Sequence, residues 1–247
     1  MHYIIFDLEF NQDFSSLKSS DNKSSRSLFE IIQIGAIKLD LNYNTITTFN
    51  RYIRPTIYEK INPFITDLTG ITTKQLLSEE SFPEVYKAYI EFIDGYDSVF
   101  CIWGMSDLKV LFRNVDFYKL NQNILPKLFI NIQPHVSEHL GIHPKTLLQL
   151  QHAVESLNIS KIYQFHNAIY DAYYTAEIFK KINNLSIEPK VYDPSYVVIR
   201  PRQRKREIDF DGLLGQFTKM YDREMTEEEQ DIIKLAYKMG RTNQFLK

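Results

Sequence analysis

The chain has a single cysteine and no long hydrophobic run among its 247 residues. One cysteine excludes a disulfide framework and any zinc site built from several cysteines. No apolar run approaches the roughly 20 residues that a membrane-spanning helix needs. The first ten residues also lack the basic region of a secretory signal peptide. These absences predict a cytoplasmic protein without a membrane partner.

Neither sign of charge is in large excess. Lys and Arg number 29, Asp and Glu number 31, and the net charge is -2. This balance gives no general signal for nucleic-acid binding, so any basic surface must be local. With 44% hydrophobic and 14% aromatic residues, the chain can bury a sizeable core. Its length fits one α/β domain, or one domain with a small appendage.

Hydrophobic patterns predict strands first and then an alternation with helices. Ser81 is followed by Glu84, a capping-box spacing that predicts the start of one helix. The order of elements suggests a mixed sheet with helices on its faces, which is an α/β fold. The predicted strands are residues 3–10, 31–39, 46–53, 98–103 and 129–132, and the predicted helices are residues 82–94, 106–115, 146–157 and 168–182.

Two segments differ in composition from the rest of the chain. Residues 15–27 are a serine-rich polar insert, which could cover a site or be a tolerated surface loop; we favour the loop. Prolines punctuate the chain after residue 185, and the basic run RPRQRKR occupies residues 200–206. A last helix is predicted from Thr226 as N-cap and Glu229 at N3, with Gly240 as its stop. We therefore divide the chain into a domain of residues 1–184 and a C-terminal extension of residues 185–247.

Asp7 and Glu9 lie two residues apart in the first predicted strand. Side chains two apart on a strand project from the same face, so both carboxylates are expected side by side. Two buried like charges are costly unless a cation neutralises them, and oxygen ligands suit Mg²⁺ or Mn²⁺. The alternative is that both acids are hydrated at the end of the strand.

Asp107 follows the apolar strand that ends at Trp103 and Gly104, where a strand gives way to a helix. Ligands of open α/β sheets bind at that edge, although an acid at a helix N-terminus also suits the helix dipole. His166 and Asp171 share a helical face poorly, which favours His166 on a loop and Asp171 in the first turn of the next helix. The alternative is a surface histidine beside a dipole-matched aspartate.

Together these four carboxylates and one histidine suit two-metal hydrolysis of a phosphodiester. One metal would activate the attacking water and the other would stabilise the leaving oxygen. A histidine can accept the proton of that water at neutral pH.

The set Asp7-x-Glu9, Asp107 and His166-x-x-x-x-Asp171 resembles the DEDDh branch of the DEDD 3′-to-5′ exonucleases. Four further segments resemble motifs of that family, and their details are most similar to the KapD-like and Eri-type exoribonuclease group. The resemblance covers about residues 3–184. These segments are EIIQIGAI at residues 30–37, Arg-Pro at 54–55, LTGIT at 68–72 and WGMSD at 103–107.

The resemblance implies a ribonuclease H-like fold with a five-stranded mixed sheet flanked by helices. It also implies two Mg²⁺ or Mn²⁺ ions held by the four acids, with His166 as general base. The expected substrate is single-stranded nucleic acid, RNA rather than DNA, degraded from the 3′ end to nucleoside 5′-monophosphates. The alternatives are a DNA exonuclease of the proofreading or trimming type and a non-catalytic binding module. The presence of all five residues argues against the module.

Two groups of residues are candidate substrate contacts. In the resembled family the residues just after the glutamate meet the 3′-terminal nucleotide, which makes Phe10 and Asn11 candidates. Phe10 could stack on a base, and ordinary strand-end packing is the alternative for both. Arg202, Arg204 and Arg206 could track phosphates, or could simply form a solvated face.

Three other features are given no role in the chemistry. His135, His139 and His143 recur every four residues, but Gly141 interrupts their helix, so we expect no metal site there. Cys101 is expected to be an inert core thiol. Trp103 is expected to belong to the core beside the site.

Overall fold

The computed structural model describes residues 1–12, 28–94, 97–143, 145–182, 187–195 and 208–241. Packing divides the chain into a first unit, Met1–Tyr196, and a second unit, Val197–Lys247. The predicted insert at residues 15–27 and the basic run at residues 200–206 lie outside the described residues.

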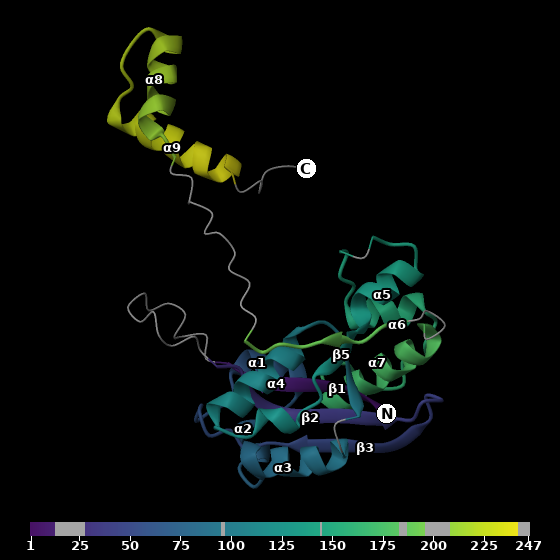
Figure 1. Cartoon of the computed structure of the whole chain (residues 1–247). Helices are drawn as coiled ribbons and strands as arrows, with labels where there is room; N and C mark the ends of the chain where they lie inside the picture. The colour runs from purple at the N-terminus through teal and green to yellow at the C-terminus, as the bar shows by residue number, and fades with distance from the viewer. Residues whose placement is uncertain (13–27, 95–96, 144, 183–186, 196–207, 242–247) are drawn as a thin grey trace. The chain divides into compact units, whose positions relative to one another are not determined.

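A six-stranded sheet runs through the first unit in the order β3-β2-β1-β4-β5-β6 (Figure 1). β1, β2 and β3 form an antiparallel meander, β4 and β5 add in parallel, and β6 pairs antiparallel with β5. The predicted α/β fold with a mixed sheet is confirmed, with one strand more than expected. The strands are β1 His2–Asn11, β2 Glu30–Leu39, β3 Thr45–Tyr52, β4 Ser98–Ile102, β5 Leu128–Asn131 and β6 Lys190–Val191.

The additional strand, β6, lies within the predicted C-terminal extension. It is only two residues long, too short to produce a period-two pattern that the sequence could reveal. Tyr192 follows it and donates its backbone N–H to the Lys127 carbonyl oxygen at 2.7 Å. The Tyr192 ring packs on Phe112 and Phe129, with centroids 4.9 and 6.0 Å away. β6 and Tyr192 therefore pack at the edge of the sheet and belong to the first unit, although both follow the predicted boundary at residues 184/185.

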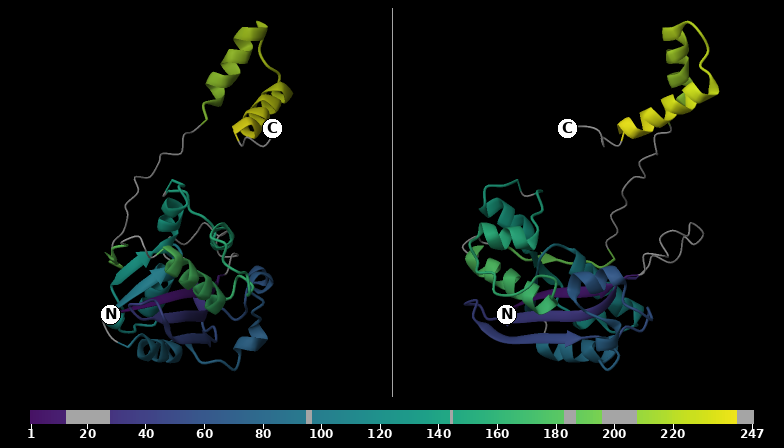
Figure 2. Two further views of the ribbon diagram at one scale, coloured as in Figure 1. Left: turned by 90° about the vertical axis from the view of Figure 1, so that its right-hand side faces the viewer. Right: turned by 180° about the vertical axis from the view of Figure 1, so that it is seen from behind.

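Helices pack on both faces of the sheet (Figures 1 and 2). The face that buries Ile4, Phe6 and Leu8 of β1 is covered by α3, Phe82–Ile93, and α4, Ser106–Phe117. The opposite face buries Ile5 and is covered by three helices. Because side chains alternate along a strand, Asp7 and Glu9 project toward this second face. The three helices are α5 Ile132–His139, α6 Leu150–Ser156 and α7 Ala168–Ile182.

The LTGIT segment forms the junction of two short helices, α1 Pro63–Thr69 and α2 Thr73–Leu76. Gly70 ends α1 with a φ of 74°, a left-handed conformation that glycine adopts without strain. Thr72 and Gln75 form a capping box that starts α2. Seven and four residues are too few for a clear helical period, so the sequence did not predict either helix.

Elsewhere, the helix ends differ from the prediction. The helix expected over residues 146–157 begins only at Leu150, and α5 was not predicted. A short 3-10 helix, η2 (Gln122–Ile124), precedes β5.

The second unit is a pair of helices, α8 Phe210–Tyr221 and α9 Glu227–Arg241. The sequence did not predict α8. The predicted cap of α9 is confirmed, since the Thr226 N–H donates to Glu229 at 2.9 Å and the Glu229 N–H donates back at 3.3 Å. The predicted stop at Gly240 is wrong, because α9 continues through it; a glycine inside a helix costs only about 1 kcal/mol. None of the helices in the described residues is long and apolar enough to cross a membrane.

Candidate active site

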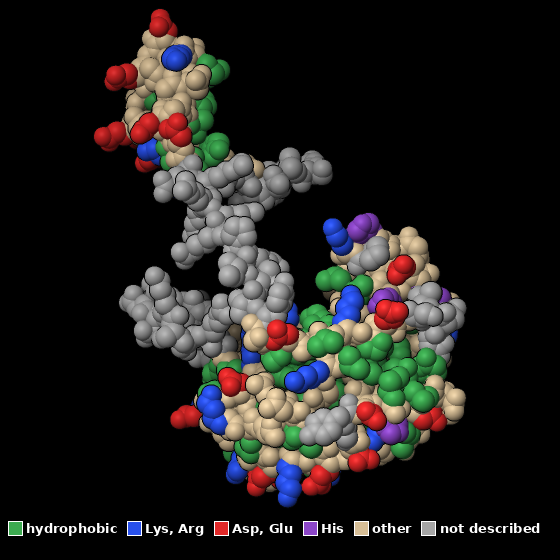
Figure 3. Space-filling model, in the orientation of Figure 1, with side chains coloured by type: hydrophobic (Ala, Val, Ile, Leu, Met, Phe, Trp, Pro, Cys, Tyr) green, Lys and Arg blue, Asp and Glu red, His purple; other side chains and the backbone are tan. Residues whose placement is uncertain are grey.

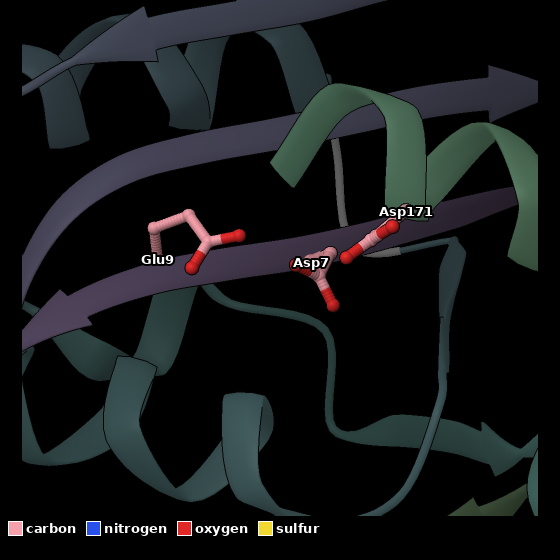
Figure 4. Close-up of side chains that lie close together, drawn as sticks. All are labelled: Asp7, Glu9 and Asp171. Carbon is pink, nitrogen blue, oxygen red and sulfur yellow. The ribbon is translucent and has the colours of Figure 1, made fainter. Parts of the chain in front are cut away.

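Asp7 and Glu9 project from the same side of β1, as their spacing predicted (Figure 4). In the β1–β2 ladder Asp7 pairs with Gly35 and Glu9 pairs with Gln33. The register shifts directly after Glu9, a β-bulge of the kind that re-aims side chains beside sites.

Asp171 reaches the same place from the first turn of α7. One carboxylate oxygen from each of Asp7, Glu9 and Asp171 lies within 4.8 Å of the others. Glu9 is 9% exposed and Asp171 is 8% exposed, so the group is largely withdrawn from water. Asp171 Oδ1 is buried without a hydrogen-bond partner. A cluster of hard oxygen ligands with an unsatisfied buried oxygen fits a divalent cation.

α7 reaches the acids because Gly35 has no side chain. A Cβ built on Gly35 would overlap the backbone of Ala168 and Ile169, the first residues of α7. Ala172 and Ala176, buried one turn apart, continue this close approach of the helix to the sheet. The small residues therefore set how near Asp171 comes to β1.

His166 lies on the loop just before α7, as predicted. Its φ is 65°, and its backbone N–H donates to Asp171 Oδ2 at 3.0 Å. The loop is also fixed upstream, where the Tyr174 hydroxyl contacts both the N–H and the carbonyl of Tyr163 at 2.7 Å. His166 itself is exposed to solvent.

Asp107 lies in the first turn of α4 and is 7% exposed. It stands outside the close group of three carboxylates found among the described residues. The loop before it is held by Gly104, which has a φ of 82° and donates its N–H to Asn131 Oδ1 at 2.9 Å. Further along α4, Asn114 bonds the Phe29 carbonyl at 2.8 Å and the Ile31 N–H at 3.3 Å.

Burial raises the pKa of all four acids. The pKa of Glu9 rises to about 8, first through loss of water and then through the charges of Asp171 and Asp107. The same loss of water raises the pKa of Asp7 well above its ordinary value and that of Asp107 to about 7. The pKa of Asp171 rises to about 6, and the hydrogen bond from the His166 backbone opposes the rise. A cation would remove the repulsion that makes these groups hard to ionise.

The two candidate contacts after Glu9 differ in their surroundings. Phe10 is partly buried, and its ring packs edge-on against Phe29 at 5.0 Å. Asn11 is 1% exposed, its Nδ2 donates to the Lys60 carbonyl at 3.0 Å, and its Oδ1 accepts from the Asn62 N–H at 2.9 Å. The Asn11 amide is therefore used within the fold, as in the strand-end packing alternative, and is not open to a substrate.

The remaining residues singled out in the sequence do not belong to the close carboxylate group found among the described residues. Arg202, Arg204 and Arg206 lie outside the described residues. Figure 3 shows Lys and Arg interspersed with Asp and Glu over the visible face of the first unit. None of the three histidines, His135, His139 and His143, joins the carboxylate group found within the described ranges. Cys101 is fully buried, which raises the pKa of its thiol, and Trp103 packs partly buried against the core of the α7 face.

The EIIQIGAI segment contains positioning residues that sequence reasoning did not identify. The Glu30 carboxylate accepts the backbone N–H groups of Thr56, Ile57 and Tyr58, and so fixes the chain after β3. Gly35 admits α7. The only signal for Glu30 and Gly35 in the sequence was that both lie in the EIIQIGAI motif. The structure shows which backbone groups Glu30 binds and which helix Gly35 admits.

Comparison with known proteins assigns the first unit to a family. The RNase T family model, described as Exonuclease, matches residues 4–179. The chain is 28% identical over 161 residues to 3′-5′ exoribonuclease 1 of Rattus norvegicus, covering 61% of this chain and 46% of the relative. It is also 28% identical over 183 residues to "Probable 3'-5' exonuclease KapD" of Bacillus subtilis (strain 168), covering 72% of this chain and 83% of the relative. The chain thus spans less than half the length of the rat relative.

Solved structures of nucleases share the fold. The nuclease domain of 3′hExo, a DEDDh family member bound to rAMP, superposes with a TM-score of 0.63 at 21% identity, covering 78% of this chain and 96% of that one. E. coli exonuclease I in complex with a dA16 oligonucleotide gives 0.56 at 16% identity, covering 74% and 41%. The family match over residues 4–179 shows that this chain belongs to the RNase T exonuclease family.

Proposed function

We propose that this chain is a divalent-cation-dependent 3′-to-5′ exonuclease. It removes nucleoside 5′-monophosphates from single-stranded nucleic acid, with RNA preferred to DNA. The observation that carries the proposal is the close group of Asp7, Glu9 and Asp171, in which Asp171 Oδ1 is buried and lacks a hydrogen-bond partner. Family membership supports the reaction class.

The four acids would hold two Mg²⁺ or Mn²⁺ ions, which when bound lower the barrier to attack of water on the phosphodiester. His166 would accept the proton of that water at its exposed imidazole. The water oxygen forms a bond to phosphorus, the bond from phosphorus to the 3′ oxygen of the preceding nucleotide breaks, and that oxygen takes a proton. Asp171 serves twice, since its Oδ2 also holds the His166 backbone in place.

The preference for RNA is supported by the relatives and is not read from the site. The rat relative is named an exoribonuclease, and the 3′hExo domain was solved with a ribonucleotide. E. coli exonuclease I, by contrast, was solved with a DNA oligonucleotide. RNA differs from DNA by its 2′-hydroxyl, so a rate comparison on matched oligonucleotides decides between the two substrates.

The test is a time course on 5′-labelled single-stranded RNA and DNA of matched sequence. Each is incubated with Mn²⁺, Mg²⁺ or chelator, and Asp7→Asn serves as the inactive control. We expect a descending ladder from RNA that chelator and the variant both abolish. A faster DNA ladder would replace the RNA preference with the DNA alternative. Tight binding without degradation of either strand would instead indicate a binding module.

The basic run carries a separate prediction about substrate grip. Replacing Arg202, Arg204 and Arg206 with glutamine should flatten the dependence of log binding constant on log salt. Three lost phosphate contacts on a single strand correspond to a change in slope of about 2. The measurement is a salt titration of oligonucleotide binding by fluorescence anisotropy. An unchanged slope removes these arginines from substrate binding.

A further inference from the structure

Gln33 lies on β2 directly opposite Glu9 and is fully buried. Its amide joins three segments. The Oε1 atom accepts the Ala168 N–H at 3.3 Å, and Nε2 donates to Asn167 Oδ1 at 3.1 Å and to Asn50 Oδ1 at 2.9 Å. Both donors and the acceptor oxygen of the amide are therefore engaged.

Two of these bonds meet the start of α7. The first N–H groups of a helix lack acceptors within the helix, so the bond to Ala168 satisfies a donor that would otherwise be buried and unpaired. The Asn167 carbonyl accepts the N–H groups of Tyr170 and Asp171 and so begins the helix. Gln33 thus holds Asn167 and Ala168, the two residues that follow His166 and lead into the rest of the turn carrying Asp171.

We infer that Gln33 is a positioning residue for the carboxylate group. It ties the first turn of α7 to the β2 position paired with Glu9, and so sets where Asp171 and His166 stand relative to β1. The neighbouring paired position, Gly35, supplies the space for the helix, and Gln33 supplies the bonds that hold it there. The inference rests on the proposed function, but the effect of Gln33 on metal binding can be measured whether or not the chain degrades nucleic acid.

The hydrogen bonds of the amide, and not only its volume, are required. A leucine at position 33 would fill a similar volume and leave the Ala168 N–H unpaired. Residues that orient metal ligands cost 10–100-fold in metal affinity or activity when removed. We therefore expect Gln33→Leu to weaken Mn²⁺ binding about tenfold and to lower kcat about 10–100-fold. The KM for the oligonucleotide should change less than about threefold.

Asn167 and Asn50 provide matched variants. Asn167→Ala removes the oxygen that accepts from Gln33 Nε2 and should resemble Gln33→Leu. Asn50→Ala removes the partner on β3 without touching α7 and should change neither Mn²⁺ affinity nor kcat. If Gln33 and Asn167 act through their shared bond, the Gln33→Leu/Asn167→Ala double variant should be no worse than either single variant.

The experiment is calorimetric titration with Mn²⁺ on the full chain, followed by steady-state kinetics at temperatures where circular dichroism shows each variant folded. A variant that only lowers the melting temperature, with Mn²⁺ affinity and kcat unchanged, overturns the inference, and so does full additivity in the double variant. If Gln33→Leu does not fold, the comparison of Asn167→Ala with Asn50→Ala decides the same question. A wild-type chain that binds Mn²⁺ but degrades nothing would refute the proposed function while leaving this test in force.

Discussion

At the residue scale, the acids of the site oppose folding when they are ionised without a cation. Glu9 has its pKa raised to about 8 by burial and by neighbouring carboxylates, so the folded protein holds its proton more tightly than the unfolded chain does. The favourable contribution of such a group is complete at low pH and is lost as the pH rises through its folded pKa. Stability without metal should therefore decline between about pH 5 and pH 8.

Glu9→Gln tests this pH dependence. With chelator at pH 8 the variant should melt above the wild type, because it removes a buried charge while keeping the shape of the side chain. At pH 5 the difference should vanish, since wild-type Glu9 is then protonated. Each kcal/mol corresponds to about 2–4 °C in the melting temperature for a chain of this size. Excess Mn²⁺ at pH 8 should reverse the order, and a variant less stable than wild type in chelator would contradict the argument.

His166 should be separable from metal binding, because only its backbone contacts Asp171. His166→Ala keeps that N–H and should bind Mn²⁺ as the wild type does. Its turnover should fall about 10²–10⁴-fold, the usual contribution of a general base. Single-turnover kinetics at saturating Mn²⁺ measure the loss. Wild-type turnover in this variant would remove His166 from the reaction.

At the scale of elements, the contact between α7 and β2 decides whether the site exists. Gly35→Ala should push α7 outward, because its Cβ would overlap the backbone of Ala168 and Ile169. Overpacking of this kind costs about 1–3 kcal/mol. We expect a lower melting temperature together with weaker Mn²⁺ binding, since Asp171 moves with the helix.

Gly215→Ala is the matched control for this change. Gly215 lies in α8, and a Cβ there meets nothing within 4 Å. Alanine should stabilise that helix by up to about 1 kcal/mol and leave Mn²⁺ binding unchanged. Equal Mn²⁺ affinity in the Gly35→Ala variant and the wild type would show that α7 can shift without moving Asp171.

Sequence reasoning reached the elements whose signals are local. The two-residue spacing placed Asp7 and Glu9 on one face, and the five-residue spacing placed His166 before α7 and Asp171 within it. It did not predict elements or residue roles that depend on contacts with distant parts of the chain. β6 exists through its pairing with β5, and Gln33 acts through bonds to Asn167 and Ala168, which are more than 130 residues away in the chain.

At the scale of the whole molecule, the position of the domain boundary becomes testable. The five proposed catalytic residues all lie in Met1–Tyr196, and so does β6. A chain ending at residue 196 should fold and bind Mn²⁺ like the full protein. A chain ending at residue 184 loses β6 and the Tyr192 ring, which uncovers Phe112 and Phe129.

Lost aromatic pairs cost about 0.5–1.5 kcal/mol each beyond their buried area. The shorter chain should therefore melt several degrees below the chain ending at 196, by differential scanning calorimetry. Equal melting temperatures would support the division at 184/185 predicted from the sequence.

The close contact at Gly35 also bears on how this sequence can change over generations. Every other amino acid carries a Cβ, so no substitution at position 35 is neutral as long as α7 packs this closely against β2. Asp7 pairs with Gly35 in the β1–β2 ladder. Substitutions at position 35 are therefore constrained together with those at Asp7. A descendant that loses this glycine must either restore it or recruit its fourth acid from another turn of α7.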